Sequence, residues 1–308
     1  MALNLTGLPF IDRPDFHDLL DSGHFGRWST EALSLHEQGF CVLDLGEPTF
    51  LEKTETVIQE LQPLLEDQLS LWEHGEVGPP RLQDGWQNHS AIRALALEPI
   101  ILDLLRHLYG REPFAFQTLN FAVGSEQPYH SDAIHFHSYP LGFMCGVWIA
   151  LQDVQMQSGP LIYYPGSHRL PYLSAESLHL EPQEVAAEPH PQRFFQEHWH
   201  QAVQEWGYTK QLFLPKRGEV LIWHANLLHG GEAVKDRTSR RWSQVIHYFF
   251  ANCLYTTPLS SFGHADGGPC LRNPFDIATG QRRYNQRDWE ALGLTPPQRP
   301  HQAPPLLT

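Results

Sequence analysis

The segment that contains His130 and Asp132 has the residue types and spacing of a metal site. The two residues are two positions apart, so in an extended strand their side chains point the same way and can reach one ion. A histidine from a distant strand would complete a face of two histidines and one carboxylate. That face leaves three coordination positions open for a bidentate co-substrate and dioxygen. His130 and Asp132 are therefore candidate ligands of iron.

The spacing alone is a weak signal, because the chain has 19 histidines. Three other pairs have a similar form: His74 with Glu76, His179 with Glu181, and His264 with Asp266. These pairs lie in a polar stretch, in a predicted insertion and near the chain end, respectively. Only the pair at 130 lies between predicted strands and precedes a second strand that carries histidines.

That second strand is GEVLIWHANLLHGG, residues 218–231, and it offers two candidates for the third ligand. On residue type alone, either His224 or His229 could bind the ion. His229 is followed by Gly230 and Gly231, which let the backbone approach a site closely. Both His224 and His229 therefore remain candidates for the third ligand.

A basic residue at the start of the next predicted strand could bind an acid beside the metal. Arg240 lies eleven residues after His229, and a guanidinium can hold a distal carboxylate through two parallel hydrogen bonds. Arg241 is the alternative, since strand alternation turns only one of the two inward.

Together these motifs resemble the phytanoyl-CoA dioxygenase family of iron(II)/2-oxoglutarate-dependent oxygenases. The similarity runs from about residue 38 to 250, and rests on HSD at 130–132, VWIALQDVQMQSGPLIYYPGSH at 147–168, WHANLLH at 223–229, and Arg240. It implies iron(II) on His130, Asp132 and His229, and 2-oxoglutarate on Arg240. Gln117 and Asn120, on the strand before the HSD, match polar positions that approach the co-substrate in some relatives.

The same resemblance implies oxidation of an unactivated C–H bond of a small molecule, with dioxygen consumed and succinate and carbon dioxide released. A carboxylate at position 132 favours hydroxylation, or a related desaturation or ring-forming step. Two rival classes stay open: a zinc hydrolase on the same three ligands, and a binding module that has lost turnover. No general base obviously accompanies the three ligands, and Arg240 would have no purpose in a hydrolase.

The sequence patterns around these residues predict a mainly β fold with flanking helices. Residues 1–113 are mostly helical by pattern, including 51–65 and 99–109. Residues 114–252 contain at least five short segments rich in β-branched and aromatic residues, without regular helices between them. This pattern favours an antiparallel barrel, and the family resemblance implies a double-stranded β-helix of jelly-roll or cupin type. We expect residues 1–308 to form one domain.

An insertion at 172–213 and a tail at 253–308 depart from the family pattern. Within the insertion, residues 193–207 place Phe195, Trp199 and Trp206 at helical spacing. We expect this helix to border the mouth of the site, with Trp199, His135 and His137 as candidate substrate contacts. The alternative is that the insertion packs on the outer wall. The tail should wrap around the core, with a short helix near residues 286–292.

Composition limits the partners that we expect. The formal charge of −14 argues against a nucleic-acid partner, but local groups of Lys and Arg at 210–217 and 237–241 leave room for an anionic small ligand. No run approaches 18 unbroken apolar residues, and the first residues lack a signal-peptide pattern. We expect a cytoplasmic protein with four reduced cysteines and a small-molecule substrate. Its oligomeric state and the identity of its substrate are not fixed by these patterns.

Overall fold

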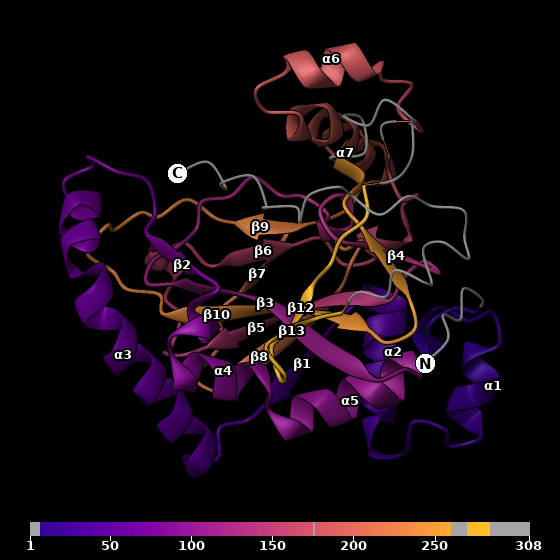
Figure 1. Cartoon of the computed structure of the whole chain (residues 1–308), viewed down its shortest axis with the longest axis horizontal. Coiled ribbons are helices and arrows are strands. Elements are labelled where there is room, and N and C mark those ends of the chain that lie inside the picture. The colour runs from indigo at the N-terminus through magenta and orange to yellow at the C-terminus, as the bar shows by residue number, and fades with distance from the viewer. Residues whose placement is uncertain (1–6, 175, 260–269, 284–308) are drawn as a thin grey trace.

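The computed structural model describes residues 7–174, 176–259 and 270–283. Six antiparallel strands form the larger sheet, in the order β1-β8-β5-β10-β3-β2. In that order their bounds are Phe40–Asp44, Glu219–His224, Met144–Ala150, Ser243–Phe250, Pro113–Phe121 and Arg81–Gln83. A smaller sheet has the order β7-β6-β9, with bounds Gln211–Phe213, Leu161–Tyr163 and His229–Gly231. The smaller sheet lies over one face of the larger sheet (Figure 1), and the expected double-stranded β-helix is confirmed.

The N-terminal helices pack on the other face of the larger sheet (Figure 1). The helices up to the third strand are α1 (Phe16–Asp21), α2 (Ser29–Gln38), α3 (Pro48–Glu73), α4 (Ser90–Ala96) and α5 (Pro99–Tyr109). In α3 the buried positions Val57, Leu61, Leu65 and Leu69 recur every fourth residue, so one stripe of the helix faces the core. Both α2 and α5 end at a glycine in the left-handed conformation.

Strand β10 shows how the larger sheet separates its two faces. The Tyr248 hydroxyl donates to the carbonyl of Ala96 on the helical side. Val245 packs in the apolar cluster between the two sheets. Since side chains alternate along a strand, His247 lies on the same inner face as Val245. The residues that face the smaller sheet are therefore the ones available to a site.

The insertion and the end of the described chain cover one end of the two sheets. Helices α6 (Pro182–Ala187) and α7 (Gln192–Trp206) project beyond the smaller sheet (Figure 1). Strand β4 (His137–Tyr139) pairs with β11 (Leu254–Thr256), and β12 (Phe275–Asp276) pairs with β13 (Gln281–Arg282). The helix expected at 286–292 and the His264–Asp266 pair lie outside the described residues.

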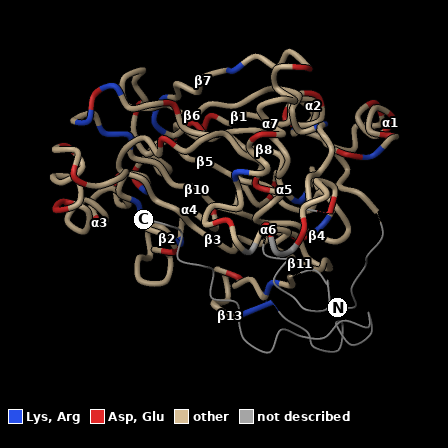
Figure 2. Tube along the Cα trace, turned by 90° about the horizontal axis from the view of Figure 1, so that it is seen from above, with Lys and Arg blue, Asp and Glu red and all other residues tan. Residues whose placement is uncertain are grey.

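Charged residues are concentrated away from the central strands. Figure 2 shows the middle of the larger sheet almost free of Lys, Arg, Asp and Glu, while helices and loops carry them. Strands β3, β5 and β10 contain no charged residue. Within the described ranges, no helix is both long and apolar enough to cross a membrane.

Candidate metal site

The three predicted ligands meet in the structure. One ligand atom from each of His130, Asp132 and His229 lies within 4.8 Å of the other two, and all three residues are buried. The His130 Nε2 atom is 3.6 Å from Asp132 Oδ1, and the His229 Nε2 atom is 3.7 Å from Asp132 Oδ2. Two imidazoles and one carboxylate in this arrangement suit a non-heme iron(II) ion.

A pair of backbone hydrogen bonds holds the two histidines side by side. His130 N donates to the His229 carbonyl at 2.8 Å, and His229 N donates to the His130 carbonyl at 3.0 Å. Gly230 makes this approach possible, because a Cβ there would lie 2.7 Å from the Gln127 carbonyl oxygen and 2.8 Å from the Tyr129 backbone. The close approach expected from the glycines after His229 is thus present.

Each histidine uses its other ring nitrogen to fix its orientation. The Nδ1 atom of His130 lies 3.0 Å from the Pro128 carbonyl oxygen, and that of His229 lies 2.9 Å from the Leu227 carbonyl oxygen. A carbonyl only accepts, so Nδ1 must carry the proton in both rings. The lone pair of each Nε2 is then free to bind a metal.

Two residues that the sequence analysis did not select hold Asp132. Trp223 Nε1 donates to Asp132 Oδ2 at 2.8 Å, and His247 Nε2 lies 3.5 Å from the same oxygen. His247 Nδ1 lies 3.0 Å from Gln117 Oε1. A Cβ at Gly146 would come within 2.1 Å of the Trp223 ring, so glycine there leaves room for the indole.

Burial and neighbouring charges set the protonation states of the three candidate ligands. Burial acts to raise the pKa of Asp132, but the charges of His229 and His247 outweigh it and hold that pKa well below its usual range. Burial lowers the pKa of His229 to about 4. Burial also acts to lower the pKa of His130, but the hydrogen bond and charge of Asp132 outweigh it and raise that pKa. Asp132 and His229 are thus held in the forms that bind metal, whereas His130 would release a proton when an ion binds.

The local backbone at the ligands differs from the sequence expectation. His130 forms an isolated bridge with His229, and Asp132 begins a short 3-10 helix, Asp132–Ile134. Ser131 starts this turn by accepting from Ala133 N at 3.2 Å. The prediction that an extended strand aligns the two side chains was wrong. A turn brings them together instead.

The ligands open into a cavity of about 810 Å³. Its wall includes the inner face of the larger sheet, with Gln117, Leu119, Trp148, Val245 and His247. The first turn of α7 lies on another wall, through Gln192, Arg193 and Gln196. The expectation that this helix borders the mouth of the site agrees with these positions.

Arg241, and not Arg240, faces this cavity. Arg241 is only 2% exposed, and its Nε atom is buried without a hydrogen-bond acceptor. Its guanidinium lies over Trp148, 5.5 Å from the ring centroid, and Nη2 makes a long 3.4 Å contact with the Val123 carbonyl. Burial lowers the pKa of Arg241 to about 10, which still leaves it charged at neutral pH.

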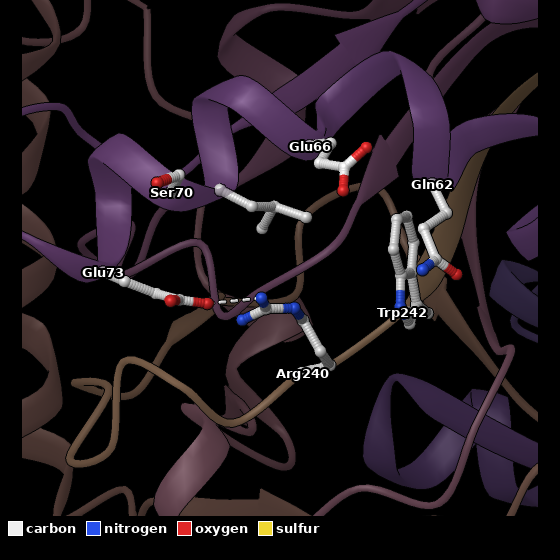
Figure 3. A pocket seen from close by; sticks show the side chains of 7 residues that line it. Gln62, Glu66, Ser70, Glu73, Arg240 and Trp242 are labelled. Atoms are coloured by element: carbon white, nitrogen blue, oxygen red, sulfur yellow. Dashed lines mark hydrogen bonds and ion pairs between the residues drawn. The ribbon is translucent and has the colours of Figure 1, made fainter.

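The prediction that Arg240 faces the interior was wrong. Arg240 turns toward α3, where it pairs with Glu73 and lines a separate cavity of about 320 Å³ (Figure 3). Both arginines precede Ser243, the first residue of β10. Regular strand alternation therefore does not fix which of the two points inward.

Of the two polar residues on β3, Gln117 lines the cavity and Asn120 does not. Asn120 is fully buried on the opposite face, where its Nδ2 donates to Gln244 Oε1 at 3.1 Å. Gln244 in turn donates to the Ile92 carbonyl of α4 at 2.9 Å. Residues three apart on a strand point to opposite faces, so Asn120 cannot share the role expected for Gln117.

Only one of the three candidate substrate residues lines the cavity. His135 lines the cavity, and burial lowers its pKa to about 4. His137 lies outside the cavity, in β4, with its ring 5.5 Å from that of Tyr172. Trp199 packs in an apolar cluster with Phe195 and is 3% exposed. The structure therefore contradicts the placement of His137 and Trp199 as cavity contacts.

His224 has a different set of contacts from the ligand histidines. Its Nε2 atom lies 3.2 Å from Asp12 Oδ2, and its Nδ1 atom accepts from Asn226 N at 3.1 Å. Asn226 links His224 to the turn that carries Asp132, because its Oδ1 accepts from Ser131 Oγ at 2.9 Å. His224 thus supports the turn that carries Asp132, and His229 is the histidine at the site.

Solved structures resemble this fold. The carbocyclase SnoK from nogalamycin biosynthesis, described as α-ketoglutarate dependent, aligns with a TM-score of 0.55 at 18% identity, covering 83% of this chain and 93% of that one. EctD from S. alaskensis with bound Fe aligns with a TM-score of 0.55 at 19% identity, covering 75% of this chain and 79% of that one. At these identities the likeness shows the fold.

Sequence comparison identifies the family. Phytanoyl-CoA dioxygenase domain-containing protein 1 of Mus musculus is 32% identical over 80 residues, 25% of this chain and 28% of that protein. Its counterpart in Danio rerio is 44% identical over 46 residues, 15% of this chain and 16% of that protein. These alignments span less than a third of the relatives. The family model for phytanoyl-CoA dioxygenase matches residues 35–242, and the chain belongs to the phytanoyl-CoA dioxygenase family.

Proposed function

We propose that this protein is an iron(II)- and 2-oxoglutarate-dependent oxygenase that oxidises a C–H bond of a small molecule. The observation that carries the proposal is the conjunction of a buried two-histidine, one-carboxylate cluster with a buried arginine, paired with no described carboxylate, on the wall of the same cavity. When bound, iron(II) and 2-oxoglutarate would supply the electrons that activate dioxygen, the oxidant, which no side chain can do. The protein's part is to hold, orient and shield the reactants.

Iron(II) fits the three side chains by donor type and by protonation. His130 and His229 offer Nε2 lone pairs, because carbonyl oxygens hold their Nδ1 protons. Trp223 and His247 both lie against Asp132 Oδ2, so Oδ1 is the less encumbered oxygen. We infer that Asp132 binds through Oδ1 while Oδ2 keeps its contact with the Trp223 indole.

Arg241 is the group that fits the distal carboxylate of 2-oxoglutarate. A buried guanidinium without an anionic partner is costly, and no described carboxylate lies within 4.0 Å of it. A dicarboxylate that chelates the metal at one end and meets Arg241 at the other would remove this cost. Gln117 lies on the same wall and is fixed through His247, where it can donate to the co-substrate.

The cavity offers little to the rival hydrolase. Among the described lining residues Asp132 is the sole carboxylate, and as a metal ligand it cannot also serve as a general base. The wall beside it is apolar, with Leu119, Trp148, Leu161 and Val245. Such a wall excludes water from the reactants, which suits oxidation of a C–H bond.

The test is anaerobic addition of iron(II) and 2-oxoglutarate to the purified protein. We expect the weak visible charge-transfer band of a chelated keto acid, and, on admission of air, release of succinate. The zinc-loaded protein should show no such band. Failure to form the band with iron(II), or succinate release at the same rate without iron, would contradict the proposal.

A further inference from the structure

The charge on the cavity wall is opposite in sign to that of the whole chain. The chain has 35 acidic and 21 basic residues, with Lys and Arg counted as basic. The cavity is nevertheless lined by four arginines and, within the described part, by one carboxylate, Asp132. The arginines are Arg81, Arg193, Arg241 and Arg272. The proposed function accounts for Asp132 and Arg241 only, and the cationic surplus favours a second anionic occupant.

Arg272 is the most firmly placed of the remaining cations. Its backbone N donates to the Tyr255 carbonyl of β11 at 2.7 Å, so the chain returns to the core at this point. Its Nη1 donates to Thr257 Oγ1 at 2.7 Å and to the His135 carbonyl at 3.2 Å. Its guanidinium lies over Phe136, 4.8 Å from the ring centroid. These contacts hold one edge of the guanidinium and fix its plane.

Within the described residues, the other edge of the Arg272 guanidinium has no hydrogen-bond partner. No described residue accepts a hydrogen bond from its Nε or Nη2, and no described carboxylate lies within 4.0 Å of it. Burial lowers its pKa to about 10, so the group remains charged at neutral pH. Two parallel N–H groups on one edge match the geometry of a carboxylate.

Arg272 and Arg241 lie toward different ends of β10. Arg241 precedes the strand, while Phe136, beneath Arg272, has its ring 4.8 Å from that of His247. The Arg241 guanidinium lies over Trp148, which pairs with Val245 of β10. The two guanidiniums therefore lie against different aromatic side chains of the cavity wall, and each can serve its own ligand.

The first turn of α7 adds to the positive character at the Arg272 end. Gln192 and Arg193 line the cavity, and Gln192 makes a side-chain hydrogen bond with His135. The N-terminal end of a helix carries a partial positive charge. Arg193 already has Glu188 at 3.8 Å, so Arg272 is the better anchor for an anion.

We propose that the oxidised substrate is a small organic acid whose carboxylate binds Arg272, beside Gln192. This inference rests on the proposed function, because it assigns the second occupant of the same cavity. Phe136 and Leu259 line the cavity near this anchor and suit an apolar body. An uncharged analogue of the same shape would leave the cation unpaired and bind weakly.

The test measures binding of matched acids and amides to the anaerobic protein loaded with iron(II) and saturating 2-oxoglutarate. The probes are 3-phenylpropanoate with 3-phenylpropanamide, and hexanoate with hexanamide, measured by calorimetry. Saturating 2-oxoglutarate keeps the probes away from Arg241. We expect each acid to bind the unmodified protein at least about tenfold more tightly than its amide.

Variants at two arginines complete the design. Arg272→Gln should bring acid and amide to within about twofold, Arg272→Lys should keep part of the preference, and Arg240→Gln should keep all of it. The charge-transfer band in each variant reports an intact site. If the unmodified protein forms the band but shows no preference for the acids, or binds none of the probes, this inference is overturned and the proposed function is not. A full preference in Arg272→Gln, or none in Arg272→Lys, would do the same. Absence of the band in the unmodified protein would instead reject the proposed function.

Discussion

Two cavities meet at the segment that leads into β10, and consecutive arginines point into them. Arg241 faces the cavity of the metal ligands, while Arg240 and Trp242 line the cavity beside α3 (Figure 3). The cavity beside α3 also contains Glu66 and Glu73, and Arg240 pairs with Glu73. The cavity at the metal ligands has a surplus of arginines and leaves Arg241 Nε unpaired.

The difference between the two arginines separates a structural contact from a binding group. A charge paired at the surface contributes little to stability and leaves nothing for a ligand. A buried cation without a protein partner reduces the stability of the fold, and only a bound anion can offset that loss. The two cavities can therefore be told apart by experiment, through the change that each substitution causes in metal binding, in co-substrate binding or in folding.

The largest effect should follow from removal of the central ligand. Asp132→Ala takes away the carboxylate that both histidines approach, so we expect loss of the charge-transfer band at all accessible iron(II) concentrations. Glu73→Ala, in the cavity beside α3, is the matched control and should leave the band unchanged. A band of ordinary intensity in Asp132→Ala would mean that the metal is held elsewhere.

The next effect should separate the two arginines. Loss of a bidentate charged contact costs a few kcal/mol, so Arg241→Gln should weaken 2-oxoglutarate binding about a hundredfold. Arg240→Gln should change it less than about twofold, because its partner is Glu73. Titration of the band with 2-oxoglutarate measures both. Equal effects would show that the co-substrate does not reach Arg241.

The sequence predicted the cluster of His130, Asp132 and His229 that the structure brings together. The order of the motifs and the family resemblance carried that prediction, because residue type alone left His224 as an alternative. The choice between Arg240 and Arg241 depends on the backbone just before β10. Local sequence does not determine that backbone, because neither residue belongs to a strand.

Other parts of the site depend on pairing between strands. Trp223 reaches Asp132 because β8 pairs with β5 so that Trp223 stands opposite Gly146, and His247 stands opposite Gly146 on the other side. No local pattern gives that register.

By contrast, strand alternation could have excluded Asn120, since it lies an odd number of residues from Gln117. In α7, Trp199 lies on the face that packs against the protein, and the polar first turn reaches the cavity.

A smaller effect should come from the residue that orients Asp132. Trp223→Phe removes the 2.8 Å hydrogen bond to Oδ2 but keeps most of the ring. Partners of metal ligands typically change affinity by about ten to a hundredfold, and we expect about tenfold weaker iron(II) binding in competition with a chelator. Trp242→Phe, in the cavity beside α3, is the control and should not change it. Unchanged affinity in Trp223→Phe would show that the indole does not position the ligand.

The smallest effect should come from the ion pair beside α3. Glu73 and Arg240 each expose about a third of their side chains, 31% and 32%, so solvent screens their attraction. Glu73→Gln should lower the free energy of unfolding by no more than about 1 kcal/mol, and less in high salt. A double-mutant cycle with Arg240→Gln, followed by urea unfolding, isolates the coupling between the two.

Because this pair holds no ligand in our interpretation, neither variant should alter the 2-oxoglutarate titration. A co-substrate affinity that falls with Glu73→Gln would mean that the two cavities communicate through the 240–242 segment, and the distinction between a structural and a binding arginine would then fail.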